Sequence, residues 1–385
     1  MSSLPAKPHD RTFQRRLVTV RKVTGVRTIK RSRADLVTVD HSWTVVAQKE
    51  EYTIGQIVVY FEVDSFIPSS DPRMWEYSPW FIEFDGQKGY HVRSEVTYGE
   101  LSQGLIFPIE AFNNIEAVLI EKQRSHDLAE AFRILREMSF ESDLGVKKWE
   151  VLEDTNEIVL GKAPAFFPRP GAPRAQNLPR LFDHRGLQID YQITEKLDGL
   201  SMTVYCVNKN SVWCRALPQL SPESKQETAT HRVGIANQKY DIAEREEDLY
   251  WQTAKQASLL DKISKIGGNV AVQGELVGHT IKRNSIGFGP GEHRFLIFDI
   301  FDIDKQRHRS TSEVEALCRK LSLPHVPIIA HCKLGEFATS LAELLEKAEG
   351  TGMLGKMREG LVFKTKSSTA AFKVIANSWL LEYGE

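Results

Sequence analysis

The chain has 385 residues, of which 41% are hydrophobic and 26% are charged, and its formal net charge is −1. This composition is that of an ordinary globular protein, and no run of about 18 apolar residues is present. A membrane-spanning helix and a membrane partner are therefore excluded. Because a single hydrophobic core stops growing at about 250–300 residues, we expect two or three domains.

The four cysteines form no CxxC pair, so neither a zinc site nor a disulfide scaffold is indicated. The first 22 residues have no apolar core of the signal-peptide type. Their basic, acid-poor character leaves an organelle-targeting segment open. The cytosol or the nucleus is the expected location.

Short alternating segments, separated by glycine and proline, run from Leu17 to about Ile109. They read LVTVRKV, WTVVAQ, QIVVYFEVD and QGLIFPI. Short strands at such spacing predict a small barrel or sandwich. Between residues 116 and 140, apolar residues recur at roughly helical intervals, which predicts one or two helices.

Residues 163–182 contain five prolines and one glycine, which predicts an irregular connection between two domains. Beyond it, strand-like segments alternate with helical stretches at about 245–266, 311–321 and 338–348. The strand-like segments are TEKLDGLSMTVYCV, VWCRAL, NVAVQGELVG, HRFLIFDIFDI, GLVFKT and AFKVIA. This pattern predicts an α+β domain.

Residues 11–33 hold nine lysines or arginines and no acid. Such a local excess attracts phosphate groups, so the segment is a candidate nucleic-acid contact. A solvated strand face and loop would have the same composition, and both interpretations stay open.

Lys196 lies between two acids, Glu195 and Asp198, at the end of an alternating run. A free lysine has a pKa near 10.4 and is a poor nucleophile at neutral pH. Neighbouring acids would raise that pKa further, so a nucleophilic lysine here requires the acids to be engaged by a metal ion or its waters. On this tetrad alone, a solvated hairpin turn is the alternative.

The stretch EKLDG resembles motif I of the covalent nucleotidyltransferases, the superfamily of DNA ligases, RNA ligases and mRNA capping enzymes. In that superfamily the motif I lysine forms a phosphoramidate with a nucleoside monophosphate. Five further stretches resemble later motifs, in order: VWCRA, VQGELVG, FLIFDIF, EGLVFK and AFKVIANSWLL. An ordered series over this length is far more specific than any one match.

The resemblance implies roles for individual residues. Lys196 would be the nucleophile, and Asp198, Glu275 and Glu359 would serve Mg²⁺ or Mn²⁺, its waters and the ribose. ATP would be bound by the residues around them: Glu195 at the adenine, Gly199, Arg215 at the ribose, Phe298 stacked on the base, and Lys364 and Lys373 at the α-phosphate.

Ordinary explanations exist for several of these residues. Phe298 has the pattern of a core aromatic, Lys364 and Lys373 that of surface lysines, and Arg215 that of a surface ion-pair partner. Glu275 and Glu359 are harder to explain in this way, because each interrupts an apolar strand pattern where an unpaired acid is costly to bury.

Two departures point to a branch of the superfamily. Ser201 stands where DNA ligases and capping enzymes usually have arginine in KxDGxR, and the twelve residues after Lys373 are too few for a domain of at least about 50 residues. The ending FKVIANSWLL resembles the RNA-ligase-2-like branch of ATP-dependent RNA ligases.

The N-terminal half resembles an OB-type domain that a subset of RNA ligases places before the catalytic module. The residues that carry this resemblance are VVYFEVDSFIPSS and RSEVTYGELSQGLIFPI. The segment with Arg174, Gln176 and Asn177 resembles, more loosely, the stretch before motif I in that subset. An OB fold binds nucleic acid through a positive groove with exposed aromatics, here Arg21, Lys22, Arg27, Lys30 and Arg93 with Tyr90 and Tyr98.

We therefore expect an α+β protein with an N-terminal OB-type β-barrel and an ATP-grasp-like ligase adenylation domain of antiparallel sheets with flanking helices. The expected divisions are an OB-type domain (1–112), a helical insertion with a proline-rich linker (113–175) and a nucleotidyltransferase domain (176–385). The expected function is that of a monomeric ATP-dependent RNA ligase joining 3′-OH and 5′-phosphate ends, with a nicked duplex of RNA or mixed RNA and DNA strands as one candidate substrate. A DNA ligase, a capping guanylyltransferase and an inactive nucleic-acid-binding relative are the alternatives.

Overall fold

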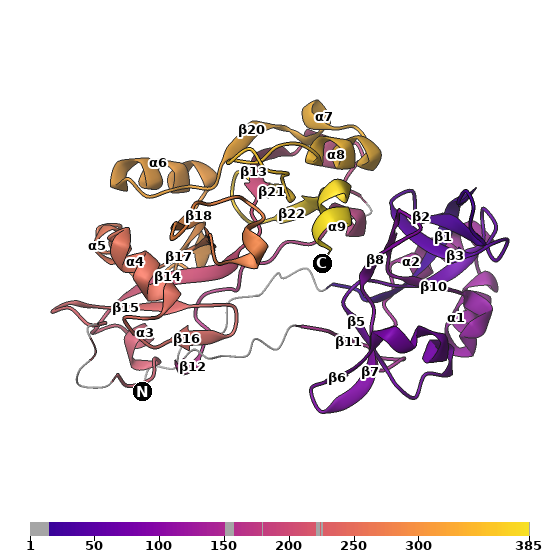
Figure 1. Ribbon diagram of the computed structural model, residues 1–385, viewed down its shortest axis with the longest axis horizontal. Coiled ribbons are helices and arrows are strands. Elements are labelled where there is room, and N and C mark those ends of the chain that lie inside the picture. Colours follow the sequence, from indigo (N-terminus) through magenta and orange to yellow (C-terminus); the bar gives the residue numbers. More distant parts are fainter. Residues whose placement is uncertain (1–14, 151–157, 179, 221–223, 225, 385) are drawn as a thin grey trace. The chain divides into compact units, whose positions relative to one another are not determined.

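The structure is a computed structural model that describes residues 15–150, 158–178, 180–220, 224 and 226–384. The chain divides into two compact units, which we describe separately (Figure 1). The N-terminal unit spans residues 14–153 and 377–385, and the C-terminal unit spans residues 154–376. In the described residues, no helix combines the length and the apolar character needed to cross a membrane.

The N-terminal unit is built on a five-stranded antiparallel sheet in the order β10-β4-β1-β2-β3. The central strand β1 pairs with β4 over Val18–Lys22 and with β2 over Val23–Thr28, with a bulge between Val23 and Gly25. A bulge bends a strand, so one strand can serve two sides of a barrel. Two smaller sheets, β11-β5-β7-β6 and β8-β9, complete the unit.

The strands of this unit are β1 (Val18–Thr28), β2 (Ala34–Val39), β3 (Trp43–Gln48), β4 (Ile57–Phe61), β5 (Ser65–Pro68), β6 (Phe81–Phe84), β7 (Gln87–His91), β8 (Ser94–Thr97), β9 (Glu100–Gln103), β10 (Leu105–Pro108) and β11 (Lys147–Lys148). Its helices are η1 (Pro72–Trp80), η2 (Ile109–Ala111), α1 (Asn113–Gln123), α2 (Leu128–Arg136) and α9 (Asn377–Tyr383). The four strands predicted between residues 17 and 109 and the two helices predicted near 116–140 are thus confirmed.

Helices α1 and α2 pack against the β-barrel and share its core. One buried cluster holds residues of the barrel and of both helices: Val18, Val59, Phe61, Ile115, Leu119, Ala131 and Leu135. The structure therefore groups residues 113–150 with the N-terminal unit, although we expected a separate insertion there. The final helix α9 also belongs to this unit and contacts β8 and β9.

The C-terminal unit contains two antiparallel sheets. A seven-stranded sheet has the order β12-β16-β15-β14-β17-β18-β19, and a four-stranded sheet has the order β20-β13-β21-β22. The strands are β12 (Val159–Lys162), β13 (Asp190–Lys196), β14 (Leu200–Asn208), β15 (His231–Ala236), β16 (Tyr240–Ile242), β17 (Val270–Gly278), β18 (His293–Asp302), β19 (Arg307–His308), β20 (Ile328–Lys333), β21 (Gly360–Thr365) and β22 (Ala371–Ile375).

Helices cover one face of each sheet. Helices α4 (Leu249–Gln256), α5 (Leu259–Ser264) and α6 (Thr311–Leu321) contact strands of the larger sheet, and α8 (Leu341–Ala348) contacts β22 (Figure 1). The remaining helices are α3 (Val212–Arg215), η3 (Ala175–Asn177), η4 (Gly186–Gln188), η5 (Lys282–Asn284) and α7 (Leu334–Phe337). The expected antiparallel α+β architecture and the three helical stretches are confirmed.

The segment VWCRAL is helical at Val212–Arg215, so the predicted strand is wrong. Ser211 caps this turn by accepting a hydrogen bond from the N–H of Cys214 at 3.2 Å. Trp213 is buried in an apolar cluster with Phe166 and Phe167, and this packing outweighs the weak strand propensity of four residues.

Candidate active site

Lys196 lies where the two sheets of the C-terminal unit meet. It is the last residue of β13 in the four-stranded sheet, and β14 of the seven-stranded sheet begins at Leu200. The run that the sequence presents as one strand-like piece is therefore two strands in different sheets. Gly199 joins them, and a Cβ there would lie 2.5 Å from the carbonyl oxygen of Leu276 and 2.7 Å from Cγ of Glu275. Only glycine permits that approach.

Strand alternation places three lysines on one face of the four-stranded sheet. Lys196 is opposite Gly360, Lys364 is opposite Gln192, and Lys373 is opposite Val362. Because successive side chains point to opposite faces, these positions share a face. The other face carries Ile193, Leu361, Phe363 and Phe372, which form a buried cluster with α7 and α8. The apolar face packs the sheet against α7 and α8, and the polar face carries the candidate site residues.

Lys196 is paired with Glu359. Its Nζ lies 2.5 Å from Glu359 Oε1, and the two side chains are 21% and 7% exposed. Burial lowers the pKa of Lys196, but Glu359, Glu275 and Asp198 together raise it above its usual value. With the acids unneutralised, Lys196 is therefore held protonated and is not a nucleophile.

Three carboxylates gather around this lysine. Burial, Glu359 and Asp198 raise the pKa of Glu275 to about 7, against the opposing effect of Lys196. Burial and Glu359 also raise the pKa of Asp198. Glu359 Oε2 is buried and has no hydrogen-bond partner in the described part of the chain. One lysine does not satisfy three crowded acids, and such a set favours a further cation.

Hard oxygen ligands of this kind suit Mg²⁺ or Mn²⁺. Within the described ranges, however, no group of three or more His, Cys, Asp or Glu side chains is close enough to form a ready-made metal cage. The residues thus fit a cation held partly through its water shell, which is the usual mode for Mg²⁺.

Glu195 lies on the opposite face of β13 from Lys196, because the two residues are adjacent in the strand. It is buried, and its Oε1 accepts a hydrogen bond from the N–H of Met353 at 3.1 Å. A Cβ on Gly352 would lie 2.3 Å from that oxygen. Burial raises the pKa of Glu195, while Met353 and Arg358 act against the rise. The structure thus ties Glu195 to the loop before β21.

Phe298 is half-buried and packs, with Met353, against one apolar cluster: Leu197, Val277, Phe288, Leu296 and Val326. Lys364 lies against one face of the Phe298 ring. The Lys364 ammonium donates to the carbonyl oxygen of Phe298 at 2.5 Å and lies 5.4 Å from the centre of its ring. It also donates to Asp299 at 3.0 Å. Lys364 was expected at the α-phosphate, but in the structure its ammonium is paired with Asp299.

Lys373 is joined through its backbone to the proline-rich segment. Its N–H donates to the carbonyl oxygen of Pro173 at 2.8 Å, and it forms a parallel bridge with Arg174. Arg174, Gln176 and Asn177 are all buried in the C-terminal unit. The segment expected as a linker therefore belongs to the body that carries the lysines.

Arg215 is not brought to Lys196. It is exposed and lies in α3, after the distant end of β14. From Leu200 to Asn208 a strand extends roughly 26 Å at about 3.3 Å per residue, which separates Arg215 from the acids. Ser285 was missed by sequence reasoning, because only its position ten residues after Glu275 could have indicated it. Its hydroxyl donates to Asp198 Oδ2 at 2.9 Å.

The expected nucleic-acid residues of the N-terminal unit differ in their surroundings. Arg21 is only 4% exposed and pairs with Asp40 at 3.0 Å, so it is not available to a ligand. Tyr90 is likewise buried. Because both side chains are covered by other parts of the protein, the structure does not present either of them to a nucleic acid.

The other expected contacts remain accessible to different degrees. Arg27 is exposed and pairs with Glu100 at 2.8 Å, while Lys22 lies 5.0 Å from the ring centre of Phe132. Arg93 donates to the carbonyl oxygen of Pro79 at 2.7 Å. Lys30 and Tyr98 are exposed. Arg11 belongs to the same basic run and lies outside the described ranges. The N-terminal segment for which organelle targeting was left open lies mostly outside them as well.

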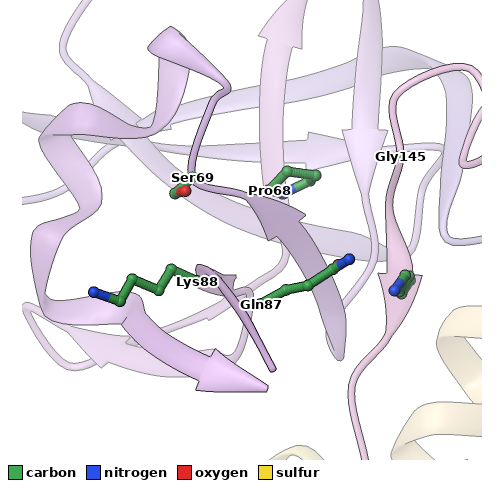
Figure 2. A pocket seen from close by; sticks show the side chains of 6 residues that line it. Pro68, Ser69, Gln87, Lys88 and Gly145 are labelled. Atoms are coloured by element: carbon green, nitrogen blue, oxygen red, sulfur yellow. The ribbon is translucent and has the colours of Figure 1, made fainter. Parts of the chain in front are cut away.

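A pocket in this unit offers two further lysines (Figure 2). It is lined by Pro68, Ser69, Gln87, Lys88, Gly145 and Lys147. Lys88 is exposed, and Lys147 lies 3.9 Å from Asp85 across the strands. Sequence reasoning missed both lysines because β5, β7 and β11, which bring them together, are far apart in the chain.

Two family models match the chain. A model described as RNA ligase matches residues 189–375, and a model of an OB-fold domain matches residues 17–109. No curated protein matches. These regions correspond to the C-terminal sheets and the N-terminal barrel, so the expected fold class is confirmed.

Among solved structures, the chain is similar to an RNA ligase of Naegleria gruberi. The complex of that ligase with pyrophosphate is 28% identical, with a TM-score of 0.73 over 96% of this chain and 99% of that chain. A variant with ATP and Mn has a TM-score of 0.72 at 28% identity over 96% and 99% of the two chains. A variant with AMP and Mn has a TM-score of 0.73 at 28% identity over 96% and 98%.

Proposed function

We propose that the chain is an ATP-dependent RNA ligase that joins RNA 3′-OH and 5′-phosphate ends through AMP bound to Lys196, in line with the RNA ligase model that matches residues 189–375. The observation that carries this proposal is the Lys196–Glu359 contact at 2.5 Å, beside Asp198 and Glu275, inside the region matched by the family model. A lysine surrounded by acids can act as a nucleophile on a phosphate group when a metal ion neutralises those acids.

The first step forms the bond between Lys196 Nζ and the α-phosphorus of ATP. The bond from that phosphorus to the bridging β-phosphate oxygen breaks, and pyrophosphate leaves with the electron pair. Lys196 must lose a proton first, and Glu359 Oε1 is its hydrogen-bonded acceptor. AMP then passes to an RNA 5′-phosphate, and the 3′-OH displaces AMP to seal the strand.

Asp198, Glu275 and Glu359 would hold Mg²⁺ or Mn²⁺, in part through water. Such a cation supplies charge neutralisation, which lowers the pKa of Lys196 and favours the neutral amine. The Naegleria ligase was solved with Mn in variants at a lysine and at glutamates, and as the apo protein in a variant at an aspartate two positions after that lysine. Lys196 and Asp198 have the same spacing, which supports this assignment.

The nucleotide would lie on the polar face of the four-stranded sheet. Phe298 would stack on the adenine, and Lys373 would hold the α-phosphate. Lys364 contacts the backbone and the ring of Phe298, so it would act on the base only through Phe298. Glu195 would read the adenine only through the loop it anchors at Met353. Arg174, which is buried and bridged through its backbone to Lys373, would serve the nucleotide in place of Arg215.

The N-terminal unit would hold the RNA. An OB-fold domain binds single strands through basic and aromatic side chains, and here the exposed Lys88, Lys147, Lys30 and Tyr98 would take that role. The monomeric state, the nicked-duplex substrate and a cytosolic or nuclear location stay predictions.

Incubation with labelled ATP and Mg²⁺ or Mn²⁺ should leave AMP on the protein, and Lys196→Ala should abolish the label. Labelled GTP in place of ATP tests a capping enzyme, and nicks with RNA or DNA on each side test a DNA ligase. An inactive relative would take no label at all. Continued labelling of the Lys196→Ala protein would refute the assignment of the nucleophile.

A further inference from the structure

The turn that follows Glu275 has an unusual backbone. Three consecutive residues other than glycine have positive φ: Lys282 at 46°, Arg283 at 56° and Asn284 at 52°. The left-handed conformation costs an L-residue free energy, and only single residues usually adopt it. A run of three persists only where the surrounding structure holds it in place, which is common at ligand sites.

Both ends of this turn are anchored. Ile281 is buried in the core of the seven-stranded sheet. Asn284 Oδ1 accepts the N–H of Phe288 at 2.8 Å, and its Nδ2 donates to the carbonyl oxygen of Phe288 at 2.8 Å. The anchors leave Lys282 exposed at the tip. The strained turn therefore exposes basic side chains to solvent.

The turn is also connected to the site. Ser285, the residue after the strained run, is buried and donates its hydroxyl to Asp198 Oδ2 at 2.9 Å. The charge of Lys282 acts on the same carboxylate and lowers its pKa, although burial and Glu359 raise it overall. Lys282 thus lies within electrostatic range of the acid two residues from the nucleophile.

Lys282 has no carboxylate within ion-pair distance among the residues that the structure describes, although acids lie near it. A second exposed lysine stands beside the turn, because a Cβ on Gly287 would lie 2.9 Å from Cγ of Lys356. The two lysines come from two loops, one after β17 and one before β21. Both lie at the turn that Ser285 ties to Asp198.

We propose that Lys282 binds a phosphate group beyond the α-phosphate, with Ser285 fixing the turn to Asp198. This inference rests on the proposed function. The shared chemistry is a phosphate dianion next to the reacting phosphorus, supplied either by the pyrophosphate portion of ATP or by the 5′-phosphate of the RNA. An ammonium group placed there stabilises charge that develops on the leaving or attacking oxygen.

The test compares Lys282→Asn with Lys282→Arg. Asparagine tolerates positive φ and removes the charge, so the turn is kept, whereas arginine keeps the charge. Lys265→Asn, an exposed lysine at the end of α5, is the matched control. Thermal unfolding of each full-length protein verifies that the fold is retained.

Three measurements separate the two phosphate sources: the rate of self-adenylylation with ATP, the binding of inorganic pyrophosphate by calorimetry, and the rate of AMP transfer from the pre-labelled protein to 5′-phosphate RNA without ATP. Lys282→Asn should lower one of the two rates by about tenfold, and Lys282→Arg should restore most of it. Loss in the first rate and in pyrophosphate binding assigns the ATP tail. Loss in AMP transfer alone assigns the RNA 5′-phosphate.

Equal behaviour of Lys282→Asn and Lys265→Asn in all three measurements would overturn the inference. That outcome differs from a failure of the proposed function, in which the unaltered protein itself would take no AMP from ATP.

Discussion

Lys364 and Asp299 form a buried ion pair beneath the ring expected to stack on the base. The Lys364 Nζ lies 3.0 Å from Asp299 Oδ2, and the two side chains are 11% and 8% exposed. His308 Nδ1 lies 3.1 Å from the same oxygen. Burial raises the pKa of Asp299, but Lys364 and His308 more than offset that effect and lower it. The pair fixes Phe298 through the bond from Lys364 to its carbonyl.

Lys364→Met should therefore lower the free energy of unfolding by up to about 3–5 kcal/mol, because it leaves the buried Asp299 carboxylate with only His308 beside it. Combining it with Asp299→Asn should recover part of the loss. Lys366→Met removes an exposed lysine that is 3.5 Å from Asp190, and it should cost at most about 1 kcal/mol. Urea unfolding gives all three values, and equal losses from Lys364→Met and Lys366→Met would contradict the buried-pair interpretation.

The raised pKa of Glu275 predicts a pH-dependent cost in the metal-free protein. The folded state holds a proton on Glu275 up to about pH 7, whereas an ordinary glutamate loses it near pH 4.5. Since the folded state binds more protons in this window, stability falls as pH rises from about 4.5 through about 7. Glu275→Gln should thus raise Tm relative to the unaltered protein at pH 8 and leave it unchanged at pH 4.

Calorimetric scans with EDTA at both pH values provide the measurement. Adding Mg²⁺ should reduce the gap at pH 8, because the cation favours the ionised acids. A Tm difference of the same size at pH 4 and pH 8 would show that Glu275 does not titrate in this window.

The close approach of Gly199 to β17 predicts a positional effect on the chemistry. Gly199→Ala would force the Lys196–Asp198 turn away from Leu276, and a displacement of about 1 Å can cost on the order of a hundredfold in rate. Gly171→Ala is the control, because a Cβ there meets no atom within 4 Å. Single-turnover self-adenylylation should be slowed only by the first variant.

The motif residues were predictable because six stretches of the chain resemble, in order, the motifs of the covalent nucleotidyltransferases. Lys196, Asp198, Glu275 and Glu359 do meet, although 163 positions separate the first from the last. Arg215 was misplaced because VWCRA has the letters of a strand, while the cap from Ser211 and the burial of Trp213 make it helical. Which lysine faces a phosphate and which is paired depends on long-range register, as Lys364 and Asp299 show.

The N-terminal barrel shows the same limit. Arg21 and Lys22 are adjacent in the basic run, but only the structure shows that Arg21 points inward to Asp40. The pocket with Lys88 and Lys147 depends on pairing of β5 with both β7 and β11, which no local pattern indicates.

These environments predict different effects on RNA and on stability. Combined Lys88→Ala and Lys147→Ala should weaken RNA binding and end joining by about tenfold at low salt, because counterions released by two phosphate contacts contribute to affinity. Self-adenylylation should be unaffected, since Lys196 lies in the other unit.

Arg21→Met should instead lower Tm, because it leaves Asp40 buried with less charge compensation. Filter binding, sealing assays and thermal scans on the three proteins separate the two effects, with Lys49→Ala, an exposed lysine on the same unit, as the control for loss of charge alone. Weaker RNA binding in Arg21→Met but not in the double variant would assign the RNA to the basic run and away from the pocket.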